Sequence, residues 1–418
     1  MSIIRDKTLA PAGRKKIDWV KEHMPVLSHL EHTYAPGQPF KGLNLSICLH
    51  LEAKTACMAE VFARSGARVA ITGSNPLSTQ DDVAAALAES GPEVYAWYNA
   101  TPEEYNSHLR HTLDAEPDLI IDDGGDLITM LHREYPALKD KVIGAAEETT
   151  TGLIRLRAME REGILAFPVI AVNDAPCKHL FDNRLGTGQS VWDGIMRATN
   201  LLIAGKTVVI CGFGWCGKGI AARARGLGAR VIICEVDPVR ALEAAMEGYE
   251  LKPLMEAAPL GNIFVTATGC NAVIGKKHFT LMKNGAMMCN AGHFNVEIDT
   301  SSLEKMATSI SDVKTNIKKY CMPNGNNLYL LAEGRLVNLA AGDGHPAEIM
   351  DLSFALQYLA MDYLCRNRGT LSRGVLPLPA ELNRQVAILK LESLGLTPDT
   401  LDEEQQKYLC SWNPDPGQ

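Results

Sequence analysis

A glycine-rich turn, Gly212-Phe-Gly-Trp-Cys-Gly217, is the feature that most constrains the fold of this chain. An apolar run at 206–211 precedes it, a helical pattern follows Gly219, and the next apolar run ends in Glu235, about 20 residues further on. Gly212 permits a tight turn, Gly214 lets the backbone approach a pyrophosphate, and Gly217 allows a helix to pack closely on a strand. The context predicts a dinucleotide-binding Rossmann unit. Glu235 would bind an adenosine ribose and repel a 2′-phosphate, so we expect NAD rather than NADP.

The same turn has two other interpretations. Gly212 and Gly217-Lys218 have the spacing of a P-loop. However, Gly219 stands where a Ser or Thr must hold magnesium, so the turn is unlike that of a nucleoside triphosphatase. An ordinary strand-to-helix turn without a ligand is the second alternative.

Alternating strand and helix patterns predict two α/β domains. With 418 residues the chain is too long for one ordinary hydrophobic core. We expect two doubly wound parallel sheets, a substrate domain and a Rossmann NAD domain, plus a small helical C-terminal segment. Strands are predicted in the first sheet at 43–49, 68–72, 118–121 and 167–172, and in the second at 206–211, 231–234, 263–266, 286–289 and near 336–339.

A predicted helix at 190–204 leads into the Rossmann strand, so the domain boundary is expected near residues 183–190, where a hinge could close the two sheets on a ligand. The expected divisions are 1–185 with 346–378 for substrate binding, 186–345 for NAD binding, and 379–418 for a helical dimerisation segment. After Pro346 the pattern is helical, and the ending after Trp412 is expected to fray.

Charge and composition exclude several classes of partner. The net charge is -8 and the basic residues are dispersed, so we expect no nucleic-acid partner. No apolar run reaches the roughly 20 residues that span a membrane, and the N-terminus lacks the pattern of a signal peptide, which indicates the cytoplasm. The eleven cysteines form no C-x-x-C pair. We therefore expect reduced thiols and no structural zinc.

Polar side chains follow several predicted strands, at the edge where open α/β sheets bind ligands. Each has an unremarkable alternative: a histidine can simply be solvated, the acidic turn at 122–126 can be ordinary loop polarity or a magnesium site, and Lys178 with Asp182 can be a surface ion pair. The clusters are His50, Asp122-Asp-Gly-Gly-Asp126, Glu147-Glu-Thr-Thr-Thr-Gly152, Asn173-Asp174, Lys178 with Asp182-Asn183, Asn290-Ala-Gly-His293 and Gly344-His345-Pro346.

Segments spread over nearly the whole chain match the pattern of one known family: Ser78-Thr-Gln-Asp81, Val94-Tyr-Ala-Trp97, Asp122-Asp-Gly-Gly-Asp126, Glu147-Glu-Thr-Thr-Thr-Gly152, Phe181-Asp-Asn183, Gly194-Ile-Met-Arg-Ala-Thr199, Ala244-Ala-Met-Glu-Gly-Tyr249, Gly292-His-Phe294 and Leu331-Ala-Glu-Gly-Arg-Leu-Val-Asn338. On these segments the chain resembles the adenosylhomocysteinase family.

The resemblance implies reversible, NAD-dependent hydrolysis of S-adenosyl-L-homocysteine to the nucleoside and homocysteine, a step of the methyl cycle in one-carbon metabolism. The thioether is unactivated, which explains why a hydrolase needs NAD. Oxidation at C3′ acidifies the C4′ proton, homocysteine is eliminated, water adds at C5′, and the stored hydride returns to C3′. The reaction is redox-neutral. The resemblance also implies a homo-oligomer, a tetramer or a dimer.

The resemblance assigns roles residue by residue. Lys178 and Asp182, helped by His293, would handle the 3′-hydroxyl proton, and His50 and Asp123 would act near C4′ and C5′. A near-neutral lysine requires desolvation or neighbouring positive charge, including that of the nicotinamide ring. The substrate-binding residues would be Glu52, Lys54, Thr55, Glu148, which holds the ribose hydroxyls, and His345, which sits on the loop over the purine. The cofactor-binding residues would be Thr149, Thr150, Thr151, Asn183, Gly212, Gly214, Trp215, Cys216, Gly217, Glu235, Thr268, Ala291 and Asn338. No metal is expected.

One departure from the family pattern concerns the purine. The family reads His-Met-Thr-x-Glu/Gln-Thr, whereas this chain reads His50-Leu-Glu-Ala-Lys-Thr55. Lys54 has three donors and no acceptor, so it would oppose the amino group of adenine and suit O6 of hypoxanthine. We hypothesise that S-inosyl-L-homocysteine competes with or outperforms the adenosyl compound. The alternative is that Lys54 points to solvent or pairs with Glu52.

A second departure lies at the C-terminus. Many family members end in Lys-Pro-Asp-His-Tyr-Arg-Tyr, which reaches the NAD of a neighbouring subunit, whereas this chain ends Pro414-Asp-Pro-Gly-Gln418. We expect the clamp on the neighbour's cofactor to be absent or weaker, so that NAD exchanges more readily. Thr187 takes the place of a family cysteine near the nicotinamide.

Two other functions remain open at this point. A 2-hydroxyacid-type NAD-dependent dehydrogenase also joins two α/β domains, and it would produce net NADH. A nucleoside sensor without catalytic activity is the alternative from the class of binding proteins.

Overall fold

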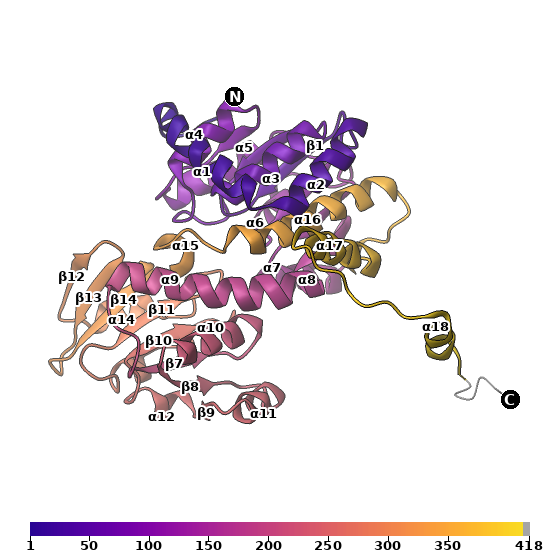
Figure 1. Cartoon of the computed structure of the whole chain (residues 1–418). Coiled ribbons are helices and arrows are strands. Elements are labelled where there is room, and N and C mark those ends of the chain that lie inside the picture. Colours follow the sequence, from indigo (N-terminus) through magenta and orange to yellow (C-terminus); the bar gives the residue numbers. More distant parts are fainter. Residues whose placement is uncertain (413–418) are drawn as a thin grey trace.

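Two β-sheets, each with helices on both faces, form the body of the chain (Figure 1). The computed structural model describes residues 1–412, so the predicted fraying after Trp412 and the departure at 414–418 lie outside the described residues. The predicted fold class of two α/β domains and a helical C-terminal segment is confirmed.

The first sheet has seven parallel strands in the order β15-β6-β5-β4-β1-β2-β3. Its strands are β1 (Asn44–Cys48), β2 (Arg68–Thr72), β3 (Glu93–Tyr95), β4 (Leu119–Asp122), β5 (Gly144–Glu147), β6 (Pro168–Ala171) and β15 (Gly374–Pro377). The helices around it are α1 (Ala10–Glu22), α2 (Pro25–Tyr34), α3 (Ala53–Arg64), α4 (Asp81–Glu89), α5 (Pro102–Leu113), α6 (Asp126–Glu134), α7 (Thr150–Arg161) and α16 (Ala347–Arg366), with the short turns η1 (Lys7–Leu9), η2 (Ala35–Gly37) and η3 (Val172–Asp174).

The strands of this sheet are apolar along their length because both faces are covered. Separate clusters of buried side chains lie on its two sides. The sequence predicted β1, β2, β4 and β6 but missed β3, β5 and β15. β3 has three residues, and β5 reads Gly-Ala-Ala-Glu, without the β-branched residues that indicate a strand. β15 follows a 20-residue helix and is held by pairing with β6.

The second sheet has eight strands in the order β12-β13-β14-β11-β10-β7-β8-β9. β13 runs antiparallel to both of its neighbours, and the other pairs are parallel. The strands are β7 (Thr207–Cys211), β8 (Arg230–Cys234), β9 (Glu250–Leu251), β10 (Ile263–Thr266), β11 (Met287–Asn290), β12 (Ser309–Lys314), β13 (Ile317–Cys321) and β14 (Asn327–Leu331). Its helices are α10 (Trp215–Gly226), α11 (Pro238–Met246), α12 (Leu254–Ala257), α13 (Lys276–Phe279), α14 (Thr300–Met306), η5 (Ala332–Gly334) and α15 (Val337–Ala340).

The strand predicted near 336–339 is wrong. These residues begin α15, and only Leu336 forms an isolated bridge, to Asn290 of β11. β14 takes the place beside β11 instead. An apolar run of four residues does not distinguish a strand from a helical turn, which explains the error.

A continuous helical stretch connects the two sheets. It consists of α8 (Pro176–Lys178), the π-helix η4 (His179–Gly186) and α9 (Thr187–Thr199), and α9 runs between the two domains (Figure 1). The predicted helix at 190–204 therefore begins and ends earlier. Gly219 of α10 faces the backbone of Arg184 so closely that any Cβ would collide with it. The nucleotide-binding helix and the connecting π-helix are thus packed directly together.

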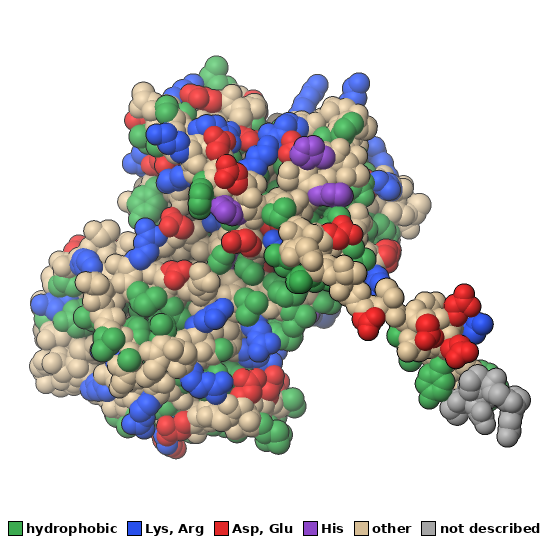
Figure 2. All heavy atoms as spheres, in the orientation of Figure 1, with side chains coloured by type: hydrophobic (Ala, Val, Ile, Leu, Met, Phe, Trp, Pro, Cys, Tyr) green, Lys and Arg blue, Asp and Glu red, His purple; other side chains and the backbone are tan. Residues whose placement is uncertain are grey.

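The C-terminal segment contains α17 (Ala380–Ser393), which packs on α16 and α2, and α18 (Glu403–Cys410), which lies away from the body (Figure 1). Tyr408 and Leu409 of α18 are exposed apolar side chains. Acidic and basic side chains are interspersed on the face shown in Figure 2. Within residues 1–412, no helix combines the length and apolarity needed to cross a membrane.

Candidate active site

One cavity between the two domains collects most of the predicted site residues. Strand order in the first sheet reverses at β1 and β4, the position where open sheets bind ligands, and His50 follows β1 while Asp123 follows β4. All predicted catalytic and substrate-binding residues line this cavity: His50, Glu52, Lys54, Thr55, Asp123, Glu148, Lys178, Asp182, His293 and His345. Five predicted cofactor residues also line it: Thr149, Asn183, Cys216, Ala291 and Asn338.

The other predicted cofactor residues lie outside the cavity lining. Thr150 and Thr151 begin α7, where Thr150 accepts a hydrogen bond from Asn173. Thr268 follows β10 and donates to Glu297. The remaining ones lie in the glycine-rich turn or after β8: Gly212, Gly214, Trp215, Gly217 and Glu235.

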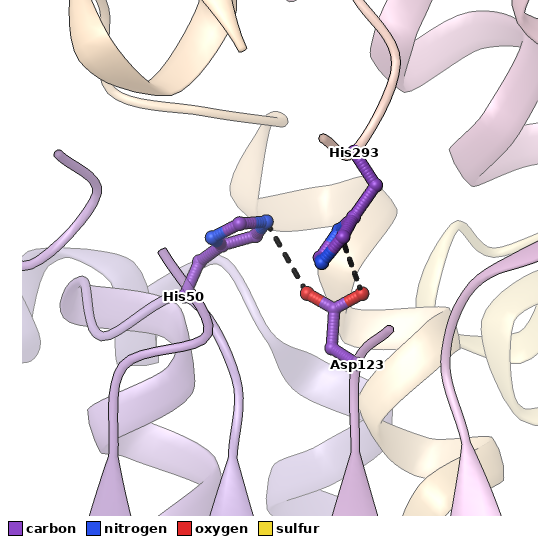
Figure 3. Close-up of side chains that lie close together, drawn as sticks. All are labelled: His50, Asp123 and His293. Carbon is purple, nitrogen blue, oxygen red and sulfur yellow. Dashed lines mark ion pairs between the residues drawn. The ribbon is translucent and has the colours of Figure 1, made fainter. Parts of the chain in front are cut away.

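His50, Asp123 and His293 meet at one end of the cavity, and we call them the histidine–aspartate cluster (Figure 3). His50 Nε2 lies 3.2 Å from Asp123 Oδ2, and His293 Nδ1 lies 3.4 Å from Asp123 Oδ1. His293 comes from the loop after β11, so the cluster joins the two domains. Ser74 donates to Asp123 Oδ2 at 3.0 Å, and its hydroxyl and that of Ser78 lie within hydrogen-bond distance of His50 Nδ1.

The charges within the cluster differ from those of free side chains. Burial lowers the pKa of His50 to about 4, so its imidazole is neutral at neutral pH. Burial opposes ionisation of Asp123, but His293, His50 and the Ser74 hydroxyl outweigh it and lower the pKa of this carboxyl. A neutral imidazole facing a carboxylate can accept or relay a proton.

The same cluster has the composition of a metal site. Its ligand atoms all lie within 4.8 Å of one another. Two imidazoles and one carboxylate are ligands that zinc and iron accept. The sequence predicted no metal, so the role of this cluster requires a chelation test.

Lys178 lies at the centre of a second buried cluster. Its Nζ lies 2.9 Å from Asp182 Oδ2 and 3.2 Å from Glu148 Oε1, and it donates to Asn183 Oδ1 at 2.9 Å. The Lys178 and Asp182 side chains are 6% and 1% exposed, so the alternative of a surface ion pair is wrong. His345 Nδ1 lies 2.7 Å from Asp182 Oδ1.

Burial alone would lower the pKa of Lys178, but Asp182 and Glu148 outweigh it, and the pKa is raised. Burial opposes ionisation of Asp182, while Lys178 and His345 lower its pKa. Burial raises the pKa of Glu148 to about 7 despite the nearby ammonium of Lys178. Lys178 is therefore an ammonium in this structure.

Two residues of α16 that the sequence did not indicate complete this cluster. Ser353 donates to Asp182 Oδ2 at 2.6 Å, and Gln357 Nε2 donates to Glu148 Oε2 at 2.6 Å. Both are fully buried and stand one helical turn apart. Two polar residues at i, i+4 spacing within the mostly apolar stretch 352–361 are the signal that could have identified them.

Lys54 occupies the other end of the cavity. Its Nζ lies 2.6 Å from Glu52 Oε2 and donates to the backbone oxygen of Asp343 at 2.7 Å. Lys54 is 5% exposed, so the alternative in which it points to solvent is wrong, whereas the pairing with Glu52 is present. Thr55 donates to the backbone oxygen of His50 at 2.6 Å and fixes the start of α3.

The glycine-rich turn fits NAD. Gly212 has φ +98°, and a Cβ there would lie 2.7 Å from the backbone oxygen of Ala267, so only glycine is free of strain. A Cβ on Gly214 would meet nothing closer than 3.7 Å, which leaves space for a pyrophosphate. Asn338 lines the cavity, and its buried Oδ1 has no hydrogen-bond partner among the described residues. This acceptor suits a carboxamide N–H.

Glu235, the predicted ribose acceptor, and Trp215 of the turn both contact other residues of the chain. Glu235 Oε2 accepts from the backbone N–H of Phe213 at 2.6 Å and keeps lone pairs for ribose hydroxyls. The Trp215 ring is stacked on His179 of the π-helix, with ring centroids 4.6 Å apart.

Two protein-family models match this chain. Residues 183–344 match the S-adenosyl-L-homocysteine hydrolase, NAD binding domain, and residues 2–136 match S-adenosyl-L-homocysteine hydrolase. An adenosylhomocysteinase from Thermococcus kodakarensis is 56% identical over 409 residues, 98% of this chain and 97% of its own. An S-inosyl-L-homocysteine hydrolase from Methanococcus maripaludis is 53% identical over 412 residues, 99% of each chain. Another S-inosyl-L-homocysteine hydrolase, from Methanocaldococcus jannaschii, is 54% identical over 409 residues, 98% of each chain.

Proposed function

Because the chain belongs to the S-adenosyl-L-homocysteine hydrolase family, we propose that it hydrolyses the thioether between homocysteine and a purine nucleoside, with S-inosyl-L-homocysteine preferred over S-adenosyl-L-homocysteine. The observation that carries the preference is the buried Lys54 ammonium, which lines the cavity and keeps one N–H donor besides its contacts with Glu52 and the backbone oxygen of Asp343. Relatives of similar identity carry both substrate names, so overall similarity does not decide between the purines. The family assignment leaves no support for the dehydrogenase alternative.

The Lys54 and Glu52 pair presents one donor group and one acceptor group to a purine. Hypoxanthine carries an acceptor at O6 and a donor at N1, whereas adenine carries a donor amino group at position 6 and an acceptor at N1. With Lys54 near position 6 and Glu52 near N1, hypoxanthine satisfies both side chains, and adenine opposes both. Lys54 has three N–H donors, of which Glu52 and the Asp343 backbone oxygen occupy two, so one remains for O6.

His50 and Asp123 are proposed to act at C4′ and C5′. His50 is neutral at neutral pH and can accept a proton, and Asp123 remains a carboxylate that holds the imidazole and a water molecule. After His50 has accepted a proton, its imidazolium can protonate the leaving thiolate. His293 closes this end from the other domain and orients Asp123.

Lys178 and Asp182 are proposed to handle the proton of the 3′-hydroxyl, and Glu148 to accept from the ribose hydroxyls. Asn183 and Asp182 fix the direction of the Lys178 ammonium. NAD held at the glycine-rich turn supplies a hydride acceptor and donor for the sugar, and its positive charge favours the neutral amine of a nearby lysine. Without such a charge, Asp182 and Glu148 keep Lys178 protonated.

We also propose a cellular location, an oligomeric state and a domain division. Eleven free cysteines suit the reducing cytoplasm. Exposed apolar side chains on α18, which lies away from the body, suit burial against a second copy, so we propose a homo-oligomer, a homotetramer or a dimer, joined through residues 379–418. The division into 1–185 with 346–378, 186–345 and 379–418 is supported by the two sheets, with β15 in the first.

The test supplies the purified protein and NAD with each thioether separately and measures released homocysteine. We expect release from both compounds and a higher kcat/KM for the inosyl compound. Equal or higher kcat/KM for the adenosyl compound contradicts the purine assignment. Release from neither, in a folded sample that binds NAD, contradicts the hydrolase proposal and favours a nucleoside sensor.

A further inference from the structure

A second pocket lies directly outside the purine end of the active-site cavity. Glu52, Lys54 and His345 line both spaces. These three side chains therefore form a wall between the buried site and the surface. We call the second space the outer pocket, and its other lining residues include Lys16, Trp19, His23, Gln189, Asp343 and Glu348.

Movable side chains hold this wall closed. Lys54 bridges it by donating to the backbone oxygen of Asp343, at 2.7 Å, from a flexible four-carbon stem. Asp343 is fixed from outside by Arg197, at 2.6 Å, but these two side chains are 73% and 60% exposed, so the pair adds little stability. His345 is held by contacts to Asp182 and Thr187 that point into the site. Rotation of Lys54 would connect the two spaces without unfolding any element.

The outer pocket carries a surface suited to a purine. The Trp19 indole is 63% exposed, and the His23 ring packs against it with centroids 4.5 Å apart. Flat aromatic faces stack on nucleobases with little dependence on the base. Gln189, on α9, and Glu348, at the start of α16, add polar groups at the rim. None of the residues predicted to hold NAD lines this pocket.

We propose that the outer pocket is an encounter site for the purine nucleoside, and that the nucleoside passes between it and the active site when Lys54 releases Asp343. This inference rests on the proposed function. It assigns Trp19 to the first contact and gives Lys54 a second role, because the ammonium that binds the purine also closes the wall behind it. The nucleoside can then enter and leave while NAD stays in place.

The experiment measures binding and release of radiolabelled inosine by NAD-loaded protein, with rapid filtration. Gln189→Trp and Glu348→Trp place a bulky side chain at the rim, and both positions are exposed, so the variants should fold. We expect the association and dissociation rates to fall together by about tenfold with Kd unchanged, because an obstruction on a route slows both directions equally. Gln189→Ala is the matched control and should keep both rates. Trp19→Ala should lower both rates by about fivefold with Kd unchanged, because Trp19 does not line the active-site cavity.

Two results would overturn the proposal. One is unchanged rates in both tryptophan variants, which would place the route elsewhere, for example past His293. The other is a slower association with an unchanged dissociation rate, which would indicate damage to the site rather than an obstruction. Homocysteine release is measured first on the same wild-type sample. Failure of that assay contradicts the proposed hydrolysis, whereas the inosine rates decide the route by themselves.

Discussion

Replacement of Lys54 by glutamine should reverse the purine preference. The glutamine N–H2 can replace the lysine as donor to the backbone oxygen of Asp343, and its carbonyl can accept from the adenine amino group. The inosyl compound loses a charged donor at O6, and the adenosyl compound is no longer opposed by an ammonium. Since Lys54 is 5% exposed, each mismatch counts nearly in full, at about 1–3 kcal/mol. Two mismatches at the lower limit of about 1 kcal/mol each together change the ratio of the two kcat/KM values by about thirtyfold.

The assay for this prediction is homocysteine release from both compounds at subsaturating concentration. Lys54→Met separates the two effects, because it removes the donor without adding an acceptor and should lower kcat/KM far more for the inosyl compound than for the adenosyl compound. Lys41→Gln, at an exposed position, is the control and should keep the wild-type ratio. A ratio within about threefold of wild type in a folded Lys54→Gln protein would refute the reasoning about position 6.

Three further predictions test other parts of the site and fold. Gln357→Leu removes a donor 2.6 Å from Glu148, so the pKa of this carboxyl should rise above its present value of about 7. The ionised form of Glu148 is lost as pH falls through its pKa. We therefore expect kcat/KM to drop about tenfold at about pH 6 but little at about pH 9. Lys390→Met leaves the buried Asp351 carboxylate without its cation and should cost about 3 kcal/mol of stability. The pKa of Asp351 is already raised by burial above its unfolded value, so the loss of stability should grow as pH rises above about 4. Thermal unfolding at several pH values measures this loss, and Lys407→Met on α18 is the control. Dialysis against EDTA should leave homocysteine release unchanged; lost activity that zinc or iron restores would instead make the histidine–aspartate cluster a metal site.

Local sequence patterns were sufficient to predict the structure where a short stretch of the chain determines its own conformation. The glycine-rich turn needs a positive φ at Gly212 and open space at Gly214, and both requirements are visible in the sequence itself. The sequence predicts that His50 and Asp123 lie at the same edge of the sheet, because both follow parallel strands. Their specific roles came from the family resemblance and remain proposals.

The features that were missed depend on contacts between distant segments. β5 has weak strand propensity and forms because β4 and β6 pair with it on either side. Ser353 and Gln357 belong to a helix more than 150 residues away from their partners Asp182 and Glu148. The contact between Lys54 and Asp343 likewise joins residues 289 positions apart. Nothing in the local sequence encodes such pairings.

The most direct test of the account compares homocysteine and NADH in the same reaction of NAD-loaded protein with S-inosyl-L-homocysteine. We expect many equivalents of homocysteine per subunit, while NADH never exceeds the amount of bound cofactor, because the hydride taken from the sugar is returned within each turnover. Accumulation of NADH in step with substrate consumption, without release of homocysteine, would contradict it.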